Sequence, residues 1–167
     1  MQKSESILSH EYFREHLHYS VITGELYWLK SRKRVKIGAA AGTLHHLGYR
    51  QIMINQRFYL AHRLAWFWVM GKWPVNQVDH KNGIKHANCW INLREATSSQ
   101  NNCNKEKPSN NTSGYKGIMW HKQCQKWQAR IVLNGKFKHL GLYTTPELAY
   151  EARLKAEKEL HGDFAKF

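Results

Sequence analysis

One segment near the middle of the chain limits what the protein can fold into. Residues 105–113 contain no apolar side chain besides Pro108 and consist otherwise of charged residues and turn formers. Such a segment is unsuited to a hydrophobic core, and its composition is typical of a linker. The 167-residue chain is therefore expected to form two small modules, with limits at 1–104, 105–112 and 113–167.

The chain is strongly basic. Lys and Arg number 26 against 12 Asp and Glu, which gives a formal net charge of +14. The excess is spread along the whole chain, and such a balance favours a nucleic-acid partner. Five basic residues gather within positions 30–36, where a hairpin in contact with phosphate is expected, although a solvated surface would carry the same charge. The residues of this cluster that we assign to DNA binding are Arg32, Lys33 and Arg34.

Cysteine usage and hydropathy bear on the cellular setting. Cys89, Cys103 and Cys124 are odd in number and form no C-x-x-C pair, so a reducing, intracellular setting is expected. No apolar run is long enough to span a bilayer, and the first residues lack the apolar stretch of a signal peptide. We therefore expect a cytoplasmic protein with no membrane partner.

The first module combines short strands with one helix. Residues 20–60 alternate short apolar runs with turn signals, which predicts antiparallel strands. Residues 60–70 place apolar side chains at helical spacing, and Gly71 followed by Pro74 supplies a stop. His62 lies in this apolar helix and is expected to be a structural histidine with its hydrogen bonds satisfied.

A second pattern follows this helix. A short strand-like run ends at His80, and residues 93–96 can return as a second strand. Thr97 with Gln100 three residues later is a capping box, which starts a helix just ahead of Asn101. The pattern predicts a β-β-α finger.

The polar residues of this finger suit one kind of chemistry. A histidine has a side-chain pKa suited to activating water at neutral pH, and His80 stands next to the carboxylate of Asp79. Asp79 and Asn101 offer oxygen ligands, which suit Mg²⁺ or Mn²⁺ better than Zn²⁺. An isolated Asp-His pair is usually a surface pair, and Asn-rich loops are common turn material. The combination with Asn92 and the capping box nevertheless favours a metal-assisted phosphodiester hydrolase.

At these residues the chain resembles the HNH, or ββα-metal, endonucleases, particularly the small phage and intron-encoded homing type. The motifs that carry the resemblance are Ala61-His62-Arg63-Leu64, Asp79-His80-Lys81-Asn82-Gly83, Asn88, Asn92-Leu93-Arg94-Glu95 and Gln100-Asn101. The resemblance covers roughly residues 20–105 and implies a ββα-metal finger at about 76–104.

This resemblance also implies a role for each polar residue of the finger. His80 would be the general base, and Asn92 would orient His80 by bridging backbone across the loop. Asp79 and Asn101 would bind the metal. Asn101 stands where the family name has His, which puts the choice of metal in question. Arg94 would clamp the scissile phosphate or only flank the strand.

The second module contains a strong hairpin signal. Asn134-Gly135 separates two strand-like runs, and both positions of such a turn favour positive φ. A two-residue turn fixes the register, pairing Val132 with Phe137 and Arg130 with His139. One face of the hairpin would then carry Gln128, Arg130, Val132, Phe137 and His139. The other would carry Ala129, Ile131, Leu140 and Leu142.

A helix is predicted after this sheet. Thr145 can cap it, with Pro146 at its first position. Leu148, Ala152 and Ala156 recur at helical spacing. We expect this helix to cover the apolar face of the sheet.

Residues 113–162 resemble the APETALA-type, or ERF, DNA-binding domain of plant ethylene-response factors. The resemblance rests on Gly114-Tyr115-Lys116-Gly117-Ile118, Lys126-Trp127-Gln128-Ala129-Arg130-Ile131 and Leu140-Gly141-Leu142-Tyr143. It implies a three-stranded antiparallel sheet packed on one helix, with Lys116, Arg130 and His139 in contact with DNA. Met119, Val132 and Phe137 occupy positions where the plant domains often carry Arg, so the plant target sequence does not transfer. A basic sheet that binds phosphate without reading bases remains an alternative.

Together these features predict an α+β protein with an N-terminal HNH nuclease domain and a C-terminal DNA-binding domain. The predicted function is site-specific, homing-type cleavage of double-stranded DNA, leaving a 5′ phosphate and a 3′ hydroxyl. A monomer would cut one strand. The gene is expected to be borne by a phage or an intron, with the protein acting inside the host cell. The alternatives are an inactive DNA-binding regulator that keeps the finger as a scaffold, and an RNA-binding module.

Overall fold

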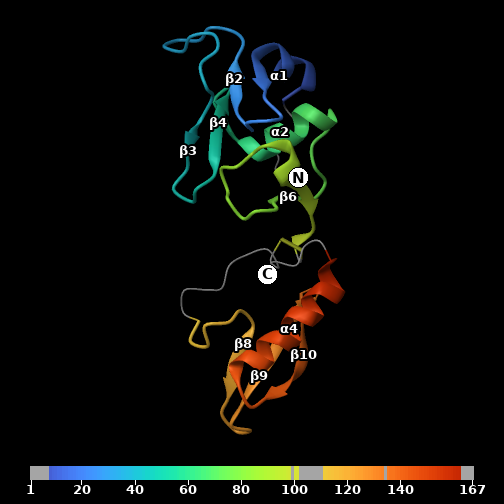
Figure 1. Cartoon of the computed structure of the whole chain (residues 1–167). Helices are drawn as coiled ribbons and strands as arrows, with labels where there is room; N and C mark the ends of the chain where they lie inside the picture. Colours follow the sequence, from blue (N-terminus) through green and yellow to red (C-terminus); the bar gives the residue numbers. More distant parts are fainter. Residues whose placement is uncertain (1–7, 99, 102–110, 134, 163–167) are drawn as a thin grey trace. The chain divides into compact units, whose positions relative to one another are not determined.

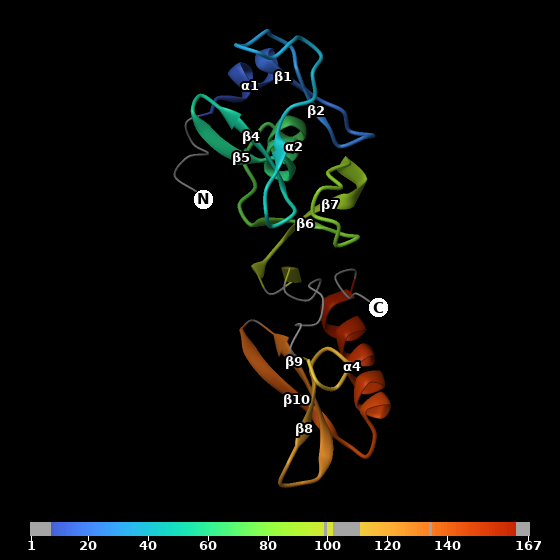
Figure 2. The same cartoon turned by 90° about the vertical axis from the view of Figure 1, so that its left-hand side faces the viewer.

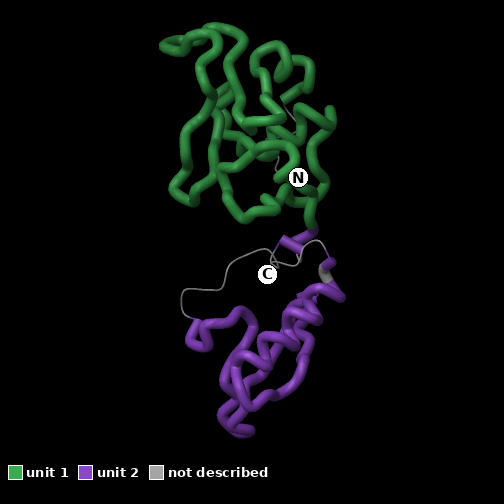
Figure 3. The backbone as a smooth tube through the Cα atoms, viewed as in Figure 1, with its two compact units in different colours: residues 1–96 green, residues 97–167 purple. Residues whose placement is uncertain are grey.

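The structure is a computed structural model that describes residues 8–98, 100–101, 111–133 and 135–162. The chain divides into two compact units, residues 1–96 and 97–167 (Figure 3). Both units combine helices with small antiparallel sheets, so the predicted α+β class is confirmed. Most of the expected linker lies outside the described residues, and the domain limits given above remain predictions.

Unit 1 is built from helices and small antiparallel sheets (Figure 1). The strands pair as β1–β2, as β3–β4–β5 and as β6–β7. In chain order the described elements are α1 (His10–His16), β1 (Leu17–Tyr19), β2 (Leu26–Trp28), β3 (Thr43–Leu44), β4 (Arg50–Ile54), β5 (Arg57–Leu60), α2 (Ala61–Met70), β6 (Gln77–His80), the 3₁₀ turn η2 (Trp90–Asn92) and β7 (Leu93–Ala96). The antiparallel strands expected over residues 20–60 are present.

Helix α2 lies at the centre of the core of unit 1. Its face toward the core buries Ala61, Leu64, Ala65 and Phe67. The helix ends at Gly71, whose φ of 70° is the left-handed conformation that glycine adopts at low cost. Strands β1, β2, β4 and β5 contribute further buried side chains to the same core, which are Leu17, Tyr19, Leu26, Trp28, Ile52, Ile54 and Tyr59. This core holds the finger strands on one side through Val78 and Leu93.

Unit 2 is a three-stranded antiparallel sheet with one long helix. Its elements are β8 (Ile118–His121), β9 (Lys126–Leu133), β10 (Lys136–Tyr143) and α4 (Pro146–His161). Strand β9 is central, and α4 lies along one face of the sheet (Figure 2). The register pairs Val132 with Phe137 and Arg130 with His139, as the turn signal predicted.

A β-bulge changes the far end of this hairpin. The register shifts between His139 and Gly141, so that Gly141 rather than Leu140 stands opposite Ala129. Leu142 consequently pairs with Gln128 and is 36% exposed. The prediction that Leu142 shares the face of Ala129 was wrong, because a bulge reverses the alternation of side chains beyond it.

Helix α4 begins as predicted, but its buried stripe differs from the predicted one. Thr145 accepts a hydrogen bond from the backbone of Leu148, and Pro146 follows it in the first turn. The buried stripe consists of Ala149, Arg153 and Glu157, one position after the predicted series, while Leu148 is 46% exposed. No helix among the described residues is long and apolar enough to cross a membrane.

Candidate functional site

Strand β6 brings the predicted base and the predicted metal ligand into the interior of unit 1. Asp79 is 5% exposed and His80 is 4% exposed. In the antiparallel pair with β7, Asp79 stands opposite Arg94 and His80 opposite Leu93.

The carboxylate of Asp79 is bound by Arg94. Both Nε and Nη2 of Arg94 lie 2.9 Å from Oδ2 of Asp79. The side chains are 13% and 6% exposed, respectively, so this ion pair is largely shielded from water. A guanidinium that uses two nitrogens on one carboxylate fixes both charge and orientation. Arg94 therefore lies within the candidate site itself.

His80 is held by a residue to which the sequence analysis gave no role. Its Nε2 lies 2.9 Å from Oδ1 of Asn88, and Asn88 is 1% exposed. Burial lowers the pKa of His80 below its usual value, and the nearby His86 lowers it further. The hydrogen bond to Asn88 and the charge of Asp79 act in the opposite direction. Asn88 belongs to the stretch that resembles the HNH family, but an asparagine in a polar loop also resembles ordinary turn material, and no role was assigned to it.

Asn92 closes the loop between the two finger strands. Its Oδ1 accepts a hydrogen bond from the backbone of Asn82 at 3.0 Å. Its Nδ2 donates to the carbonyl oxygen of Ala87 at 2.6 Å and to Oδ1 of Asn82 at 3.0 Å. The backbone N–H of Lys81 in turn donates to the carbonyl oxygen of Asn92 at 2.8 Å. One amide side chain thus ties three points of the loop that follows His80.

Two further rings lie beside His80. The ring centroid of His62 is 5.0 Å from that of His80 and 5.3 Å from that of Tyr49. Burial, with smaller contributions from His80 and Arg63, lowers the pKa of His62 to about 3. Its Nδ1 is buried without a hydrogen-bond partner among the described residues, so the expectation of a satisfied histidine was wrong. Burial and the charge of Asp79 also raise the pKa of Tyr49.

The predicted capping box is present at the start of unit 2. The backbone N–H of Thr97 donates to Oε1 of Gln100 at 2.8 Å, and the backbone N–H of Gln100 donates to Oγ1 of Thr97 at 3.3 Å. The backbone N–H of Asn101 donates to the carbonyl oxygen of Thr97 at 2.9 Å, which continues the helical turn. Asn101 lies beyond the limit of unit 1 at residue 96, and its role as a metal ligand remains a prediction.

The donors at these positions suit a hard cation. A carboxylate oxygen from Asp79 and a carboxamide oxygen from Asn101 are ligands that Mg²⁺ and Mn²⁺ accept, together with several waters. Among the described residues, no three His, Cys, Asp or Glu side chains gather into a metal-binding group.

The remaining predicted DNA contacts lie elsewhere. In unit 2, Arg130 and His139 stand opposite each other on the sheet face that α4 does not cover. Arg130 places its guanidinium 4.5 Å from the ring centre of Phe137, and His139 interacts with Gln128 at 3.0 Å. Lys116 lies in the turn before β8.

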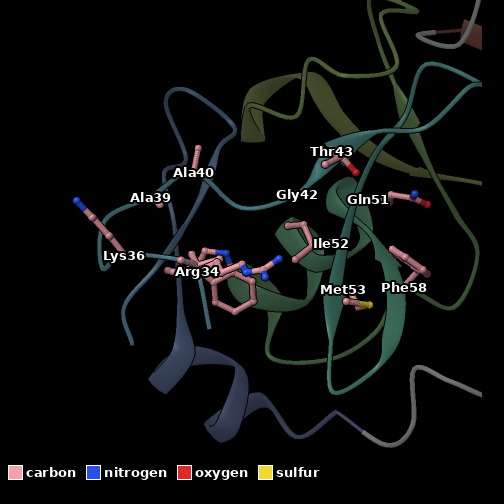
Figure 4. A pocket seen from close by; sticks show the side chains of 12 residues that line it. Arg34, Lys36, Ala39, Ala40, Gly42, Thr43, Gln51, Ile52, Met53 and Phe58 are labelled. Carbon is pink, nitrogen blue, oxygen red and sulfur yellow. The ribbon is translucent and has the colours of Figure 1, made fainter. Parts of the chain in front are cut away.

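The basic cluster of unit 1 follows β2. The guanidinium of Arg32 lies 4.3 Å from the ring centre of Trp28 and donates to the carbonyl oxygen of Met53 at 2.9 Å. Arg34 lines an open groove together with Lys36 and Phe58 (Figure 4). Lys33 is exposed. The cluster thus borders an apolar surface and presents cations toward solvent.

Comparison with known proteins identifies the family. Residues 59–103 match a family model described as HNH endonuclease, and this match lies in the middle of the chain rather than at its N-terminal end. The chain is 32% identical over 119 residues to Protein 3.8 of Escherichia phage T7, covering 67% of this chain and 95% of that protein. No solved structure matches the chain. With the Asp79-His80 pair and Asn92 inside the matched segment, the chain belongs to the HNH endonuclease family.

Proposed function

We propose that the protein is a site-specific DNA endonuclease of the homing type in which His80 is the general base. The observation that carries this proposal is the buried position of His80 beside Asp79, in a loop that Asn92 ties together. Membership of the HNH family supports nuclease action on DNA in general, and HNH nucleases generally depend on a divalent metal. The finer assignments below are part of the proposal.

The histidine is suited to accept a proton. Because burial lowers its pKa, His80 is neutral at pH 7, which is the form in which an imidazole can accept a proton. In the proposed step the imidazole takes a proton from water while the water oxygen attacks the phosphorus. The bond to the 3′ oxygen breaks as the new bond forms, and the departing oxygen takes a proton from solvent water, which leaves a 5′ phosphate and a 3′ hydroxyl.

Asp79 and Asn101 would hold Mg²⁺ or Mn²⁺ at this site. When bound, such a cation neutralises negative charge on the scissile phosphate and on the departing 3′ oxygen. Arg94 fixes the carboxylate of Asp79 with two nitrogens. A guanidinium has five N–H donors, so Arg94 can contact a phosphate oxygen while it keeps Asp79 in place.

Site preference is assigned to the basic surfaces outside the finger. Arg130 and His139 share the uncovered face of the sheet in unit 2, and Lys116 precedes that sheet. We assign this ERF-like module to recognition of double-stranded DNA. Arg32, Lys33 and Arg34 would bind phosphates along the same duplex.

One copy of the site cuts one strand, so a monomer is expected to nick its target. The similarity to a phage protein supports a role inside a host cell. A phage-encoded or intron-encoded origin would fit this setting.

One observation favours a second candidate, an inactive DNA-binding regulator. The Asp79 carboxylate is already engaged by Arg94, and this contact lowers its capacity to bind a cation. In that case the finger would serve only as a scaffold.

Plasmid nicking separates the two candidates. Supercoiled plasmid is incubated with the full chain and Mg²⁺ or Mn²⁺, with EDTA as the metal-free control. We expect the wild-type chain to relax the plasmid only in the presence of metal, and the His80→Ala substitution to abolish this activity. The control substitution His18→Ala, at an exposed position of β1, should leave the activity unchanged. Absence of cutting with either metal would favour the regulator, whereas equal cutting by His80→Ala would refute His80 as the general base.

A further inference from the structure

The loop that follows His80 is held from outside by the hairpin of β1 and β2. The hydroxyl of Tyr19 donates to the carbonyl oxygen of Asn88 at 2.6 Å, a buried contact between residues 69 positions apart. The backbone N–H of Trp90 donates to the carbonyl oxygen of Val21 at 3.0 Å. Tyr19 and Val21 precede the segment that matches the HNH family model, which begins at residue 59. The finger loop therefore depends on residues outside that segment.

The turn of this hairpin lies against the same backbone. Gly24 has a φ of +77°, and a Cβ placed there would lie 2.3 Å from the carbonyl carbon of Asn88 and 2.2 Å from the nitrogen of Cys89. Only glycine permits so close an approach of two backbones in this conformation. The turn and Tyr19 thus fix the Asn88-Cys89 peptide from two directions.

The side chain of Asn88 transmits this placement to His80. Its Oδ1 can only accept a hydrogen bond, so the contact of 2.9 Å requires the proton of the neutral imidazole to be on Nε2. Such a contact sets both the tautomer and the plane of the ring. The two side chains are 1% and 4% exposed, so water does not compete for this hydrogen bond.

The other end of the amide carries a cost. Nδ2 of Asn88 is buried without a hydrogen-bond partner among the described residues. Leaving such a buried donor unsatisfied lowers the free energy of unfolding. Asn88 therefore lowers the stability of the protein while it contacts His80. This combination is expected of a residue whose function is to position its neighbour.

We propose that Asn88 is a positioning residue for His80 and that the β1–β2 hairpin, through Tyr19 and Gly24, holds Asn88 in that role. The inference rests on the proposed function, because it takes His80 as the general base. It extends the set of residues that support catalysis from the finger to Tyr19 and Gly24 of the hairpin. Asn88 acts on the rate of the chemical step, and DNA binding does not depend on it.

Steady-state nicking by the full chain tests this role. Asn88→Leu is nearly isosteric and removes the acceptor, so kcat is expected to fall by about 10- to 100-fold with KM and DNA affinity unchanged. Asn88→Asp keeps an acceptor oxygen and should restore most of kcat. Tyr19→Phe should lower kcat by a smaller factor. Tyr27→Phe is the matched control, because its hydroxyl binds Glu25 in the same hairpin and not the loop.

Wild-type kcat in Asn88→Leu, or no recovery in Asn88→Asp, would overturn the proposal. If Asn88→Leu fails to fold, the kcat values of Asn88→Asp and Tyr19→Phe, compared with those of the wild type and Tyr27→Phe, test the proposal instead. Nitrogen-15 NMR of the His80 ring in the wild-type protein gives a readout that needs no cleavage. A proton on Nε2 supports the proposal, and a proton on Nδ1 contradicts it. A wild type that never nicks would instead refute the proposed function.

Discussion

Arg94 and Asp79 face each other across β6 and β7, and two guanidinium nitrogens lie 2.9 Å from the same carboxylate oxygen. The pair links the finger strands at the point where a cation is proposed to bind. A carboxylate that is 6% exposed needs a compensating charge. Arg94 provides that charge in the structure, and a divalent cation bound at Asp79 would add a second one.

The first prediction concerns Arg94→Leu. Removing one partner of a largely buried ion pair leaves an uncompensated charge, so the free energy of unfolding should fall by about 3–5 kcal/mol. Mn²⁺ should raise the melting temperature of this variant more than that of the wild type, because the metal replaces the lost charge. Arg94→Lys keeps the charge and serves as the control. Equal metal-induced shifts in Arg94→Leu and the wild type would contradict the role of Asp79 as a ligand.

The second prediction concerns pH and His62. Burial lowers the pKa of His62 from 6.5 to about 3 in the folded protein. Between these values the unfolded chain binds more protons, so stability is highest above pH 6.5 and falls as the pH drops toward 3. His62 alone should change the free energy of unfolding by about 1.4 kcal/mol per pH unit in this range. The loss between pH 7.5 and pH 5 is then roughly 2 kcal/mol.

Urea unfolding at several pH values measures this effect. The pKa of His80 is also lowered, so the wild-type slope contains contributions from both histidines. His62→Asn should remove the His62 part, and His18→Asn, an exposed substitution in the same unit, should leave the slope unchanged. A slope in His62→Asn equal to the wild-type slope would show that the ring is protonated in the folded state.

Features fixed by neighbouring residues could be predicted from the sequence. The capping box of Thr97 and Gln100 requires only a hydroxyl and an amide three residues apart, and the cap at Thr145 is equally local. The Asn134-Gly135 signal predicted the pairing of Arg130 with His139, because a two-residue turn leaves one register. Asp79 and His80 could be predicted as candidate site residues for the same reason, because they are adjacent in the sequence.

Features that depend on distant segments could not be predicted. The pairing of Arg94 with Asp79 depends on the register of two strands separated by a long loop. Asn88, which contacts His80, has its backbone against Tyr19 and Gly24, residues more than 60 positions away in the chain. The bulge at Leu140 and Gly141 moved Leu142 to the opposite face, and nothing in simple alternation marks a bulge.

The third prediction concerns the ion pair inside unit 2. Arg153 and Glu157 lie one helical turn apart in α4, joined at 2.6 Å, with side chains 5% and 2% exposed. Arg153→Met should cost about 3–5 kcal/mol because it leaves a buried carboxylate alone. The double variant Arg153→Met/Glu157→Leu should recover nearly all of this loss, since a buried pair gains little over well-packed apolar side chains. Thermal and urea unfolding measure the stability of both variants. A double variant as unstable as Arg153→Met would contradict the predicted recovery.

The fourth prediction concerns DNA binding by the sheet of unit 2. Arg130 lies over the ring of Phe137 on the face that α4 does not cover, which holds its guanidinium near the surface at little cost in side-chain entropy. If Arg130 neutralises one phosphate, Arg130→Gln should make the slope of log affinity against log salt less steep by about 0.9. Lys155→Gln removes the same charge from an exposed position of α4 and should leave the slope unchanged. Fluorescence anisotropy of a labelled duplex at several salt concentrations measures both, and equal changes in the two variants would mean that net charge, rather than this sheet face, binds the DNA.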